Sequence, residues 1–262
     1  MDENLTGYPL GIYQDPDGVE LASLSDHAFA HLRWRILNGE FTSGDKVKES
    51  SLAKELGISR ATIRETTRRL SGAGLLQIDA QRGVFVRTYS IEQILDIIDI
   101  RSALCDLTAT LFLERATSAD RRRIEELSRQ VSDTTPQTYR DEDYITGLLF
   151  NEAVVRGAHN ERLFALYHEA WQQIRVFKLH LLKSAPGIFD VHAYNRKVFW
   201  QGREHRAQLS EAITAGNRDD INLAMRRAAE SSGARAREMF DEFAKATATS
   251  WRDRIASAKA GS

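Results

Sequence analysis

The sequence predicts a mainly α-helical protein, with an N-terminal winged helix-turn-helix followed by a C-terminal antiparallel all-α helical bundle. Between residues 49 and 87, two helical patterns separated by a glycine precede two short strand patterns. From residue 91 to 246, apolar residues keep the helical period and no strand period occurs. Long helices joined by short connections favour an antiparallel bundle. These patterns predict two domains of different architecture.

We expect the first domain to contain, in order, one helix, a helix-turn-helix and a β-hairpin. Gly57 supplies the permissive backbone of a tight turn between two helices, and Ser59 is a good N-cap for the second of them. We expect the elements at these positions: helices over 21–37, 49–56 and 59–73, and strands over 75–78 and 84–86. The second helix of the pair then suits a major groove, with the hairpin as its wing.

Three arginines of this helix, Arg60, Arg64 and Arg68, advance by four residues and therefore line one face. Arg82 and Gly83 stand near the tip of the hairpin. Arginine donors at a recognition helix and a wing suit base edges and phosphates. The alternative interpretation is a solvated, charge-rich helix face without a partner.

The charge distribution favours the nucleic-acid interpretation. The whole chain has a formal net charge of −1, yet residues 46–90 contain nine Lys/Arg and four Asp/Glu. Residues 1–45 contain two basic and eight acidic residues. Positive charge that gathers on one motif of a near-neutral protein is typical of nucleic-acid binding.

The stretch that contains LAKELGISRATIRE and the glycine-containing hairpin resembles the DNA-binding domain of GntR-type transcriptional regulators. The resemblance covers residues 24–87. It implies that Arg60 and Arg64 contact bases or phosphates, that Ser59 and Thr62 contact phosphates, and that Arg82-Gly83 enters the minor groove. It also implies double-stranded DNA with a palindromic operator as the partner.

Most of residues 91–245 resembles the FCD ligand-binding domain of the FadR branch of that family, on Ile-Arg-Ser-Ala-Leu at 100–104 and Glu-His-Arg at 204–206. The resemblance implies a homodimer whose bundle binds a small metabolite. We expect helices over 91–116, 118–132, 138–157, 160–183, 190–215 and 218–246. The expected domains are a flexible arm (1–20), the winged helix-turn-helix (21–88), the FCD-like bundle (91–246) and a polar tail (247–262).

Many FCD domains hold a metal ion with an Asp-x-x-x-His pair and two further histidines. In this sequence the four positions hold Gly147, Asn151, Arg206 and Ala228. A slip of one residue places His205 in the site and restores one ligand only. A divalent ion needs three or four neutral or anionic donors, so we expect no bound metal and no cofactor.

Arg206 stands at one of the family's metal-ligand positions, which suggests that a guanidinium takes the place of the metal ion. A guanidinium is always charged and matches a carboxylate with two parallel hydrogen bonds. We therefore expect an effector that is a small organic anion, held by Arg206 and by Arg101 from the first bundle helix, with Asn151 as a side wall. Arg175 and His205 complete the candidate set.

Structural alternatives remain open for these residues. Arg101 could pair with Asp96 or Asp106, Arg206 could point to solvent, and either His205 or Arg206 could face the pocket. The bundle would then serve dimerisation only, and the protein would bind DNA without an effector.

Other classes are disfavoured. No apolar span suits a membrane, and Cys105 is the single cysteine, so we expect a cytoplasmic protein without an intramolecular disulfide. Catalytic motifs such as a metal-binding His-Glu pair or a nucleophile elbow are missing, so we do not expect an enzyme. The overall expectation is a metabolite-responsive repressor.

Overall fold

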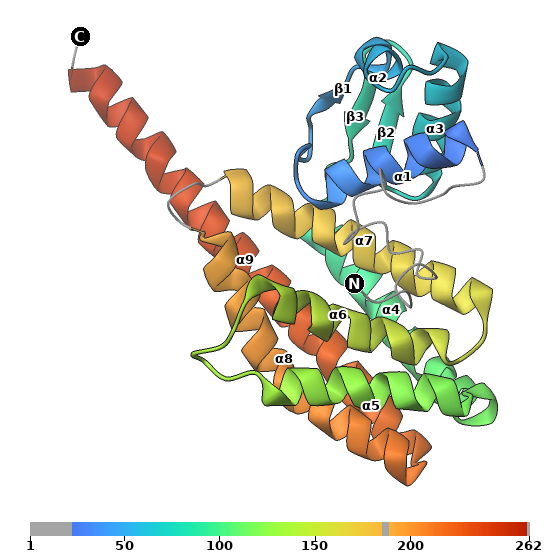
Figure 1. Cartoon of the computed structure of the whole chain (residues 1–262). Helices are drawn as coiled ribbons and strands as arrows, with labels where there is room; N and C mark the ends of the chain where they lie inside the picture. The colour runs from blue at the N-terminus through green and yellow to red at the C-terminus, as the bar shows by residue number, and fades with distance from the viewer. Residues whose placement is uncertain (1–22, 185–188, 261–262) are drawn as a thin grey trace. The chain divides into compact units, whose positions relative to one another are not determined.

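Figure 1 presents a computed structural model of the chain, which describes residues 23–184 and 189–260. The described residues form two compact units, one of residues 23–90 with 172–180 and one of the remainder from residue 91 onward. The predicted arm of residues 1–20 lies outside the described residues.

The first unit contains the predicted winged helix-turn-helix (Figure 1). Its elements are α1 (Leu24–Leu37), β1 (Lys46–Val47), α2 (Glu49–Glu55), α3 (Arg60–Gly72), β2 (Leu76–Asp79) and β3 (Gly83–Val86). The strands form an antiparallel sheet in the order β1-β3-β2, and Lys46 lies opposite Phe85. The sequence patterns missed β1, because a strand of two residues carries no alternation.

Local chemistry fixes the ends of these helices. The Ser23 hydroxyl accepts a hydrogen bond from the Asp26 amide at 3.1 Å, so α1 begins at Leu24 and not at the predicted Leu21. Gly57 has φ +65°, the left-handed conformation that the turn between α2 and α3 requires. The core beneath these elements consists of fully buried side chains: Leu32, Ile36, Leu37, Ile63, Leu70, Leu75, Leu76 and Val86.

The second unit is the predicted helical bundle. Its elements are α4 (Ile91–Arg115), α5 (Ser118–Asp133), α6 (Asp141–Arg156), α7 (Glu161–Ser184), α8 (Val191–Ala215) and α9 (Arg218–Ala260). Helix α9 continues past residue 246, where the periodicity predicted its end. Residues 172–180 of α7 group with the first unit.

The bundle helices begin and end at recognisable caps. Thr117 and Asp120 form a capping box at the start of α5, Asp190 caps α8, and Gly216 ends α8 with φ +67°. Helix α4 packs on α9, α5 packs on α6, and α6 packs on α8. Their shared core contains Phe112, Phe150, Val154, Leu209 and Ile221, among others. This packing places α4, α6, α8 and α9 where side chains from separate helices can meet.

Candidate nucleic-acid interface and bundle site

Helix α3 presents a row of exposed arginines. Ile63 and Leu70 are buried, whereas Arg60, Arg64 and Arg68 are exposed on the opposite side. Within the described part of the chain, none of these three arginines forms an ion pair. The row is therefore available to an external anion.

Arg69, one residue further on, provides a contrast. Its guanidinium bonds Asp26 at 3.0 Å and lies 4.4 Å from the centroid of the Phe29 ring, so it ties α3 to α1. A hydrogen bond from Ser23, and next the one from Arg69, lower the pKa of the Asp26 carboxyl. Sequence spacing alone does not distinguish this arginine, which pairs with Asp26, from Arg60, Arg64 and Arg68.

The N-terminus of α3 holds the two hydroxyls predicted to contact phosphates. Ser59 Oγ accepts from the Thr62 amide at 3.1 Å, and the Ser59 and Thr62 hydroxyls lie 2.9 Å apart. Ser59 therefore caps the helix, as expected, and its exposed position leaves the helix N-terminus open to a phosphate.

The wing has a fixed tip. Asp79 accepts hydrogen bonds from the amides of Arg82 and Gln81, each at 2.9 Å, and these bonds lower the pKa of its carboxyl. Gly83 follows with φ +103°. The Arg82 side chain is exposed, and its Cζ lies 5.4 Å from the centroid of the Phe85 ring. The tip thus presents Arg82 on a turn of defined geometry.

Lys46 is a second cation at the wing that sequence reasoning missed. Because β1 pairs with β3, its Nζ lies 5.7 Å from the centroid of the same Phe85 ring. A Cβ on Gly83 would meet Lys46 Cε at 3.4 Å. Only the unpredicted strand β1 brings this lysine beside the wing.

The bundle buries two of the arginines predicted for the effector site. Arg101 on α4 is 6% exposed and Arg206 on α8 is 8% exposed. The Nε atoms of both are buried without a hydrogen-bond partner among the described residues. Arg206 does not point to solvent, and it forms no ion pair with a described carboxylate.

Two glycines make room for the Arg206 guanidinium. A Cβ on Gly202 would lie 2.5 Å from Nη1, and a Cβ on Gly147 would lie 3.0 Å from Cζ. Nη2 donates to the Phe199 carbonyl at 2.7 Å. Burial, followed by the charge of Arg235, lowers the pKa of Arg206 to about 10. The guanidinium is held in place, yet no carboxylate in the described part of the chain forms an ion pair with it.

Arg235 on α9 belongs to the same cluster, and the sequence reasoning missed it. Its Nη1 donates to the Ser231 hydroxyl, and its Nε is buried without a partner among the described residues. Burial lowers its pKa; the Tyr194 and Tyr144 side chains act in the opposite direction. The available signal was its position two helical turns beyond Ala228, on the same face of α9.

The remaining predicted effector residues occupy different places. Asn151 is partly buried one turn after Gly147 on α6. His205 is partly buried; burial and then the charge of Arg235 lower its pKa. Arg175 belongs to the first unit, where its Nε donates to the Leu37 carbonyl at 2.6 Å.

The residues at the family's metal positions do not fit a metal ion. Gly147 has no donor, and the Arg206 guanidinium lies against it. Among the residues whose placement is described, no three His, Cys, Asp or Glu side chains gather as a ligand set. No described helix is long and apolar enough to cross a membrane.

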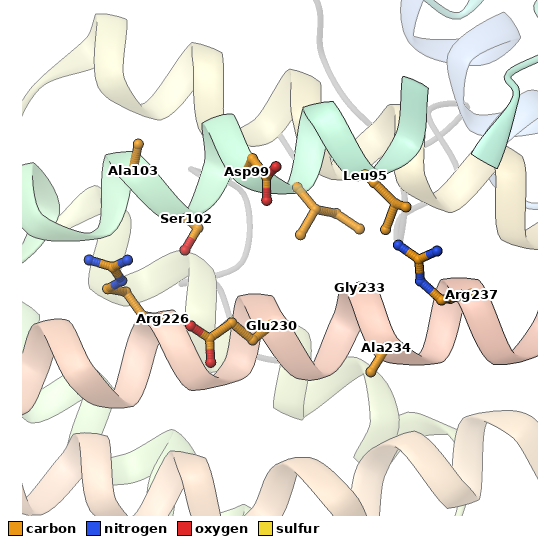
Figure 2. Close-up of a pocket in the computed structure, with 10 residues that line it drawn as sticks. Leu95, Asp99, Ser102, Ala103, Arg226, Glu230, Gly233, Ala234 and Arg237 are labelled. Atoms are coloured by element: carbon orange, nitrogen blue, oxygen red, sulfur yellow. The ribbon is translucent and has the colours of Figure 1, made fainter. Parts of the chain in front are cut away.

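A separate groove of about 560 Å³ runs between α4 and α9. Figure 2 shows Asp99 and Ser102 of α4 on one side, and Arg226, Glu230 and Arg237 of α9 on the other. Beside it, Ile100, Leu107 and Leu223 are 61%, 44% and 47% exposed. This surface, which we call the α4–α9 face, combines exposed apolar side chains with charges of both signs.

Comparison with known proteins identifies both units. Residues 24–86 match the model of bacterial regulatory proteins of the gntR family, and residues 96–231 match the FCD domain. The chain is 30% identical over 139 residues to the uncharacterized HTH-type transcriptional regulator YdhC of Bacillus subtilis. That match covers 52% of this chain but only 61% of YdhC, less than two thirds of its length.

Longer matches are less similar. The putative L-lactate dehydrogenase operon regulatory protein of Escherichia coli is 26% identical over 77% of this chain and 82% of its own. Among solved structures, E. coli McbR/YncC has a TM-score of 0.67 at 18% identity and covers 84% of this chain and 100% of that chain. Structural similarity at 18% sequence identity shows that the two proteins share a fold. From the two family matches, the chain belongs to the GntR family of transcriptional regulators, in the branch that carries an FCD domain.

Proposed function

We propose that the protein is a homodimeric repressor that binds a palindromic operator and whose operator affinity is tuned by a small organic acid in the bundle. Helix α3 enters the major groove, and the wing reaches the flanking minor groove or phosphates. A related protein of Bacillus licheniformis, 26% identical over 56% of this chain, is named the gluconate operon transcriptional repressor, which supports the repressor role. A protein of this kind works in the cytoplasm, where the DNA is.

The observation that carries DNA binding is the exposed row Arg60, Arg64 and Arg68, which has no ion-pair partner among the described residues. Exposed guanidiniums four residues apart follow one face of α3 and match the acceptors of base edges and phosphates. Arg82 and Lys46 add two exposed cations at the wing. Ser59 and Thr62 leave the N-terminus of α3 free for a phosphate.

Arg64→Ala tests this assignment. A groove-facing arginine discriminates bases by about 1–3 kcal/mol, so specific binding should weaken at least several-fold. The assay is fluorescence anisotropy at fixed salt, with duplexes that the wild-type protein selects from a random library. Arg122→Ala removes an exposed arginine of α5 and is the matched control. Equal operator affinity of Arg64→Ala and wild type would show that α3 is not the recognition helix.

The α4–α9 face supports the homodimer. It exposes Ile100, Leu107 and Leu223. Burial of large exposed apolar side chains against a partner is favourable in free energy. Asp96 and Asp99 are exposed on α4, and Arg226 and Arg237 are exposed on α9. In a two-fold dimer the same patch meets itself, so acids of one copy can approach arginines of the other.

Leu107→Asp tests this interface, because a buried unpaired carboxylate opposes association. Light scattering after size exclusion should show a monomer at micromolar concentrations, whereas Leu166→Asp, another partly exposed leucine, should leave the dimer intact. A dimer of unchanged stability in Leu107→Asp would exclude this face.

The buried arginines support the organic-acid effector. Arg101 and Arg206 are buried without carboxylate partners among the described residues, and an anionic ligand would supply the missing charge. We include Asn151 of α6 and His205 of α8, both partly buried, as polar residues of this site. Arg175 is left out of the set, because it already bonds Leu37. One relative is named for a gluconate operon and another for an L-lactate dehydrogenase operon, and gluconate and L-lactate are both carboxylates.

A thermal-shift screen with organic acids separates this proposal from a bundle that only dimerises. A ligand that binds only the folded protein raises its Tm by mass action. Stabilisation by at least one acid supports a sensor. If no acid shifts Tm while specific DNA binding persists, the protein is an effector-independent DNA-binding dimer.

A further inference from the structure

Three helices of the bundle each contribute an arginine whose Nε atom is buried, and the charges of these arginines act on one another in sequence. Arg101 comes from α4, Arg206 from α8 and Arg235 from α9. The charge of Arg235 acts on Arg206, and the charge of Arg101 acts on Arg235, in each case disfavouring the charged form. All three Nε atoms are buried and lack a hydrogen-bond partner among the described residues.

The titratable groups that act on Arg206 and Arg235 are tyrosines and other arginines. Tyr144 and Arg203 also act on Arg206, and Tyr194 and Tyr144 act on Arg235. Arg101 lies with its Cζ 5.9 Å from the centroid of the Tyr167 ring. No carboxylate of the described residues forms an ion pair with any of the three arginines. Buried like charges without counter-ions are costly, so the cluster suits a counter-charge that the described residues do not provide.

The position of Arg206 is built into the fold. Gly147 and Gly202 come from different helices; a Cβ at Gly202 would collide with the guanidinium, and one at Gly147 would press tightly against it. Two of the four positions where the family resemblance implies metal ligands are thus a glycine and the arginine that lies against it. The cation in this part of the bundle is a fixed guanidinium, and the residues present do not suit a metal.

We propose that the bundle binds a small acid that carries two or more negative groups, with Arg101, Arg206 and Arg235 as its counter-charges. The proposal rests on the organic-acid effector proposed above and narrows its chemical class. A monocarboxylate would leave two positive charges of the cluster unpaired, whereas a dicarboxylate or tricarboxylate balances most or all of the cluster. The ligand would join α4, α8 and α9, because each helix supplies one guanidinium.

The experiment compares acids of different charge on the full-length protein at constant ionic strength. Calorimetric titrations use L-lactate and gluconate as monoanions, succinate and citrate as multiply charged carboxylates, and inorganic phosphate as a non-carboxylate oxyanion. The expected result is that succinate or citrate binds at least about tenfold more tightly than either monoanion, since hydrogen bonds to charged groups are strong. Tighter binding of phosphate than of both carboxylates would overturn the carboxylate assignment.

Arginine variants test whether the acid binds at the cluster of Arg101, Arg206 and Arg235. Arg235→Met should weaken the multiply charged acid by about tenfold or more. The matched control is Arg129→Met, which removes an exposed arginine of α5 and should leave affinity unchanged. Circular dichroism checks that each variant is folded. Arg235→Lys keeps a positive charge but lacks the planar guanidinium that donates two parallel hydrogen bonds, so it should keep part of the affinity.

The outcomes separate this inference from the broader proposal. If monoanions bind as tightly as succinate and citrate, or if Arg235→Met binds like wild type, the multiply charged class is wrong while an organic-acid effector stands. If none of the acids binds, both proposals fail.

Discussion

Replacing Arg206 by methionine should leave the ligand-free protein at least as stable as wild type. Burial, and next the charge of Arg235, lowers the pKa of Arg206 well below its ordinary value, to about 10. One pKa unit corresponds to about 1.4 kcal/mol, so keeping this guanidinium charged costs the folded state on the order of 3 kcal/mol below pH 10. The sign follows from the lowered pKa: the unfolded chain holds this proton more tightly, and the cost is relieved only as pH rises above 10.

Methionine keeps the apolar stem but loses the hydrogen bond to the Phe199 carbonyl, worth about 1.5–3 kcal/mol. That carbonyl lies inside α8 and retains a helical acceptor role, so no buried acceptor is orphaned. The two effects nearly offset each other. The free energy of unfolding of Arg206→Met should therefore equal that of wild type or exceed it by up to about 2 kcal/mol.

Urea unfolding followed by far-UV circular dichroism measures this difference on protein dialysed free of organic acids. Arg156→Met is the contrasting control, because Arg156 pairs with the buried Glu152 at 2.8 Å. Removing one partner of such a pair should cost about 3 kcal/mol. If Arg206→Met is destabilised as strongly as Arg156→Met, Arg206 has a stabilising partner and the account of an uncompensated cluster is refuted.

Three further predictions concern the same bundle. Gly202→Ala places a Cβ 2.5 Å from Arg206 Nη1, so calorimetry should show at least several-fold weaker binding of the multiply charged acid; unchanged binding would mean that the guanidinium position is unimportant. Burial and the charge of Arg235 lower the pKa of His205, so its protonation opposes folding as pH falls; His205→Gln should lose less Tm than wild type between about pH 7 and 5, and an equal loss would contradict this. Elemental analysis of protein purified without a histidine tag or chelator should find far less than one transition-metal ion per chain; about one zinc or nickel would overturn the arginine-for-metal account.

Much of the DNA-binding unit could be predicted from the sequence, because its signals are local. Gly57 marks the turn, Ser59 caps α3, and the spacing of Arg60 and Arg64 places them on one exposed face. What escaped prediction depends on partners distant in sequence. Lys46 approaches the wing only through β1, and Arg69 is structural only because Asp26 and Phe29 lie beneath it.

The bundle site was harder to predict for the same reason. Helical period placed Arg101 on a buried stripe, but it could not show that Arg206 lies between Gly147 and Gly202, two glycines far apart in sequence. Arg235 stands among several charged residues of α9 that are exposed, and only packing against other helices buries its Nε. The period also gave no indication that α9 continues to Ala260.

The most direct measurement of the central claim is operator affinity in the presence of a multiply charged acid. Anisotropy titrations with a selected operator duplex should be made at constant ionic strength, because phosphate contacts make binding salt-dependent. The account predicts that citrate or succinate changes the operator Kd several-fold, that L-lactate changes it less, and that Arg206→Met no longer responds although it still binds DNA. An operator Kd that no acid alters, or an Arg206→Met variant that responds like wild type, would contradict it.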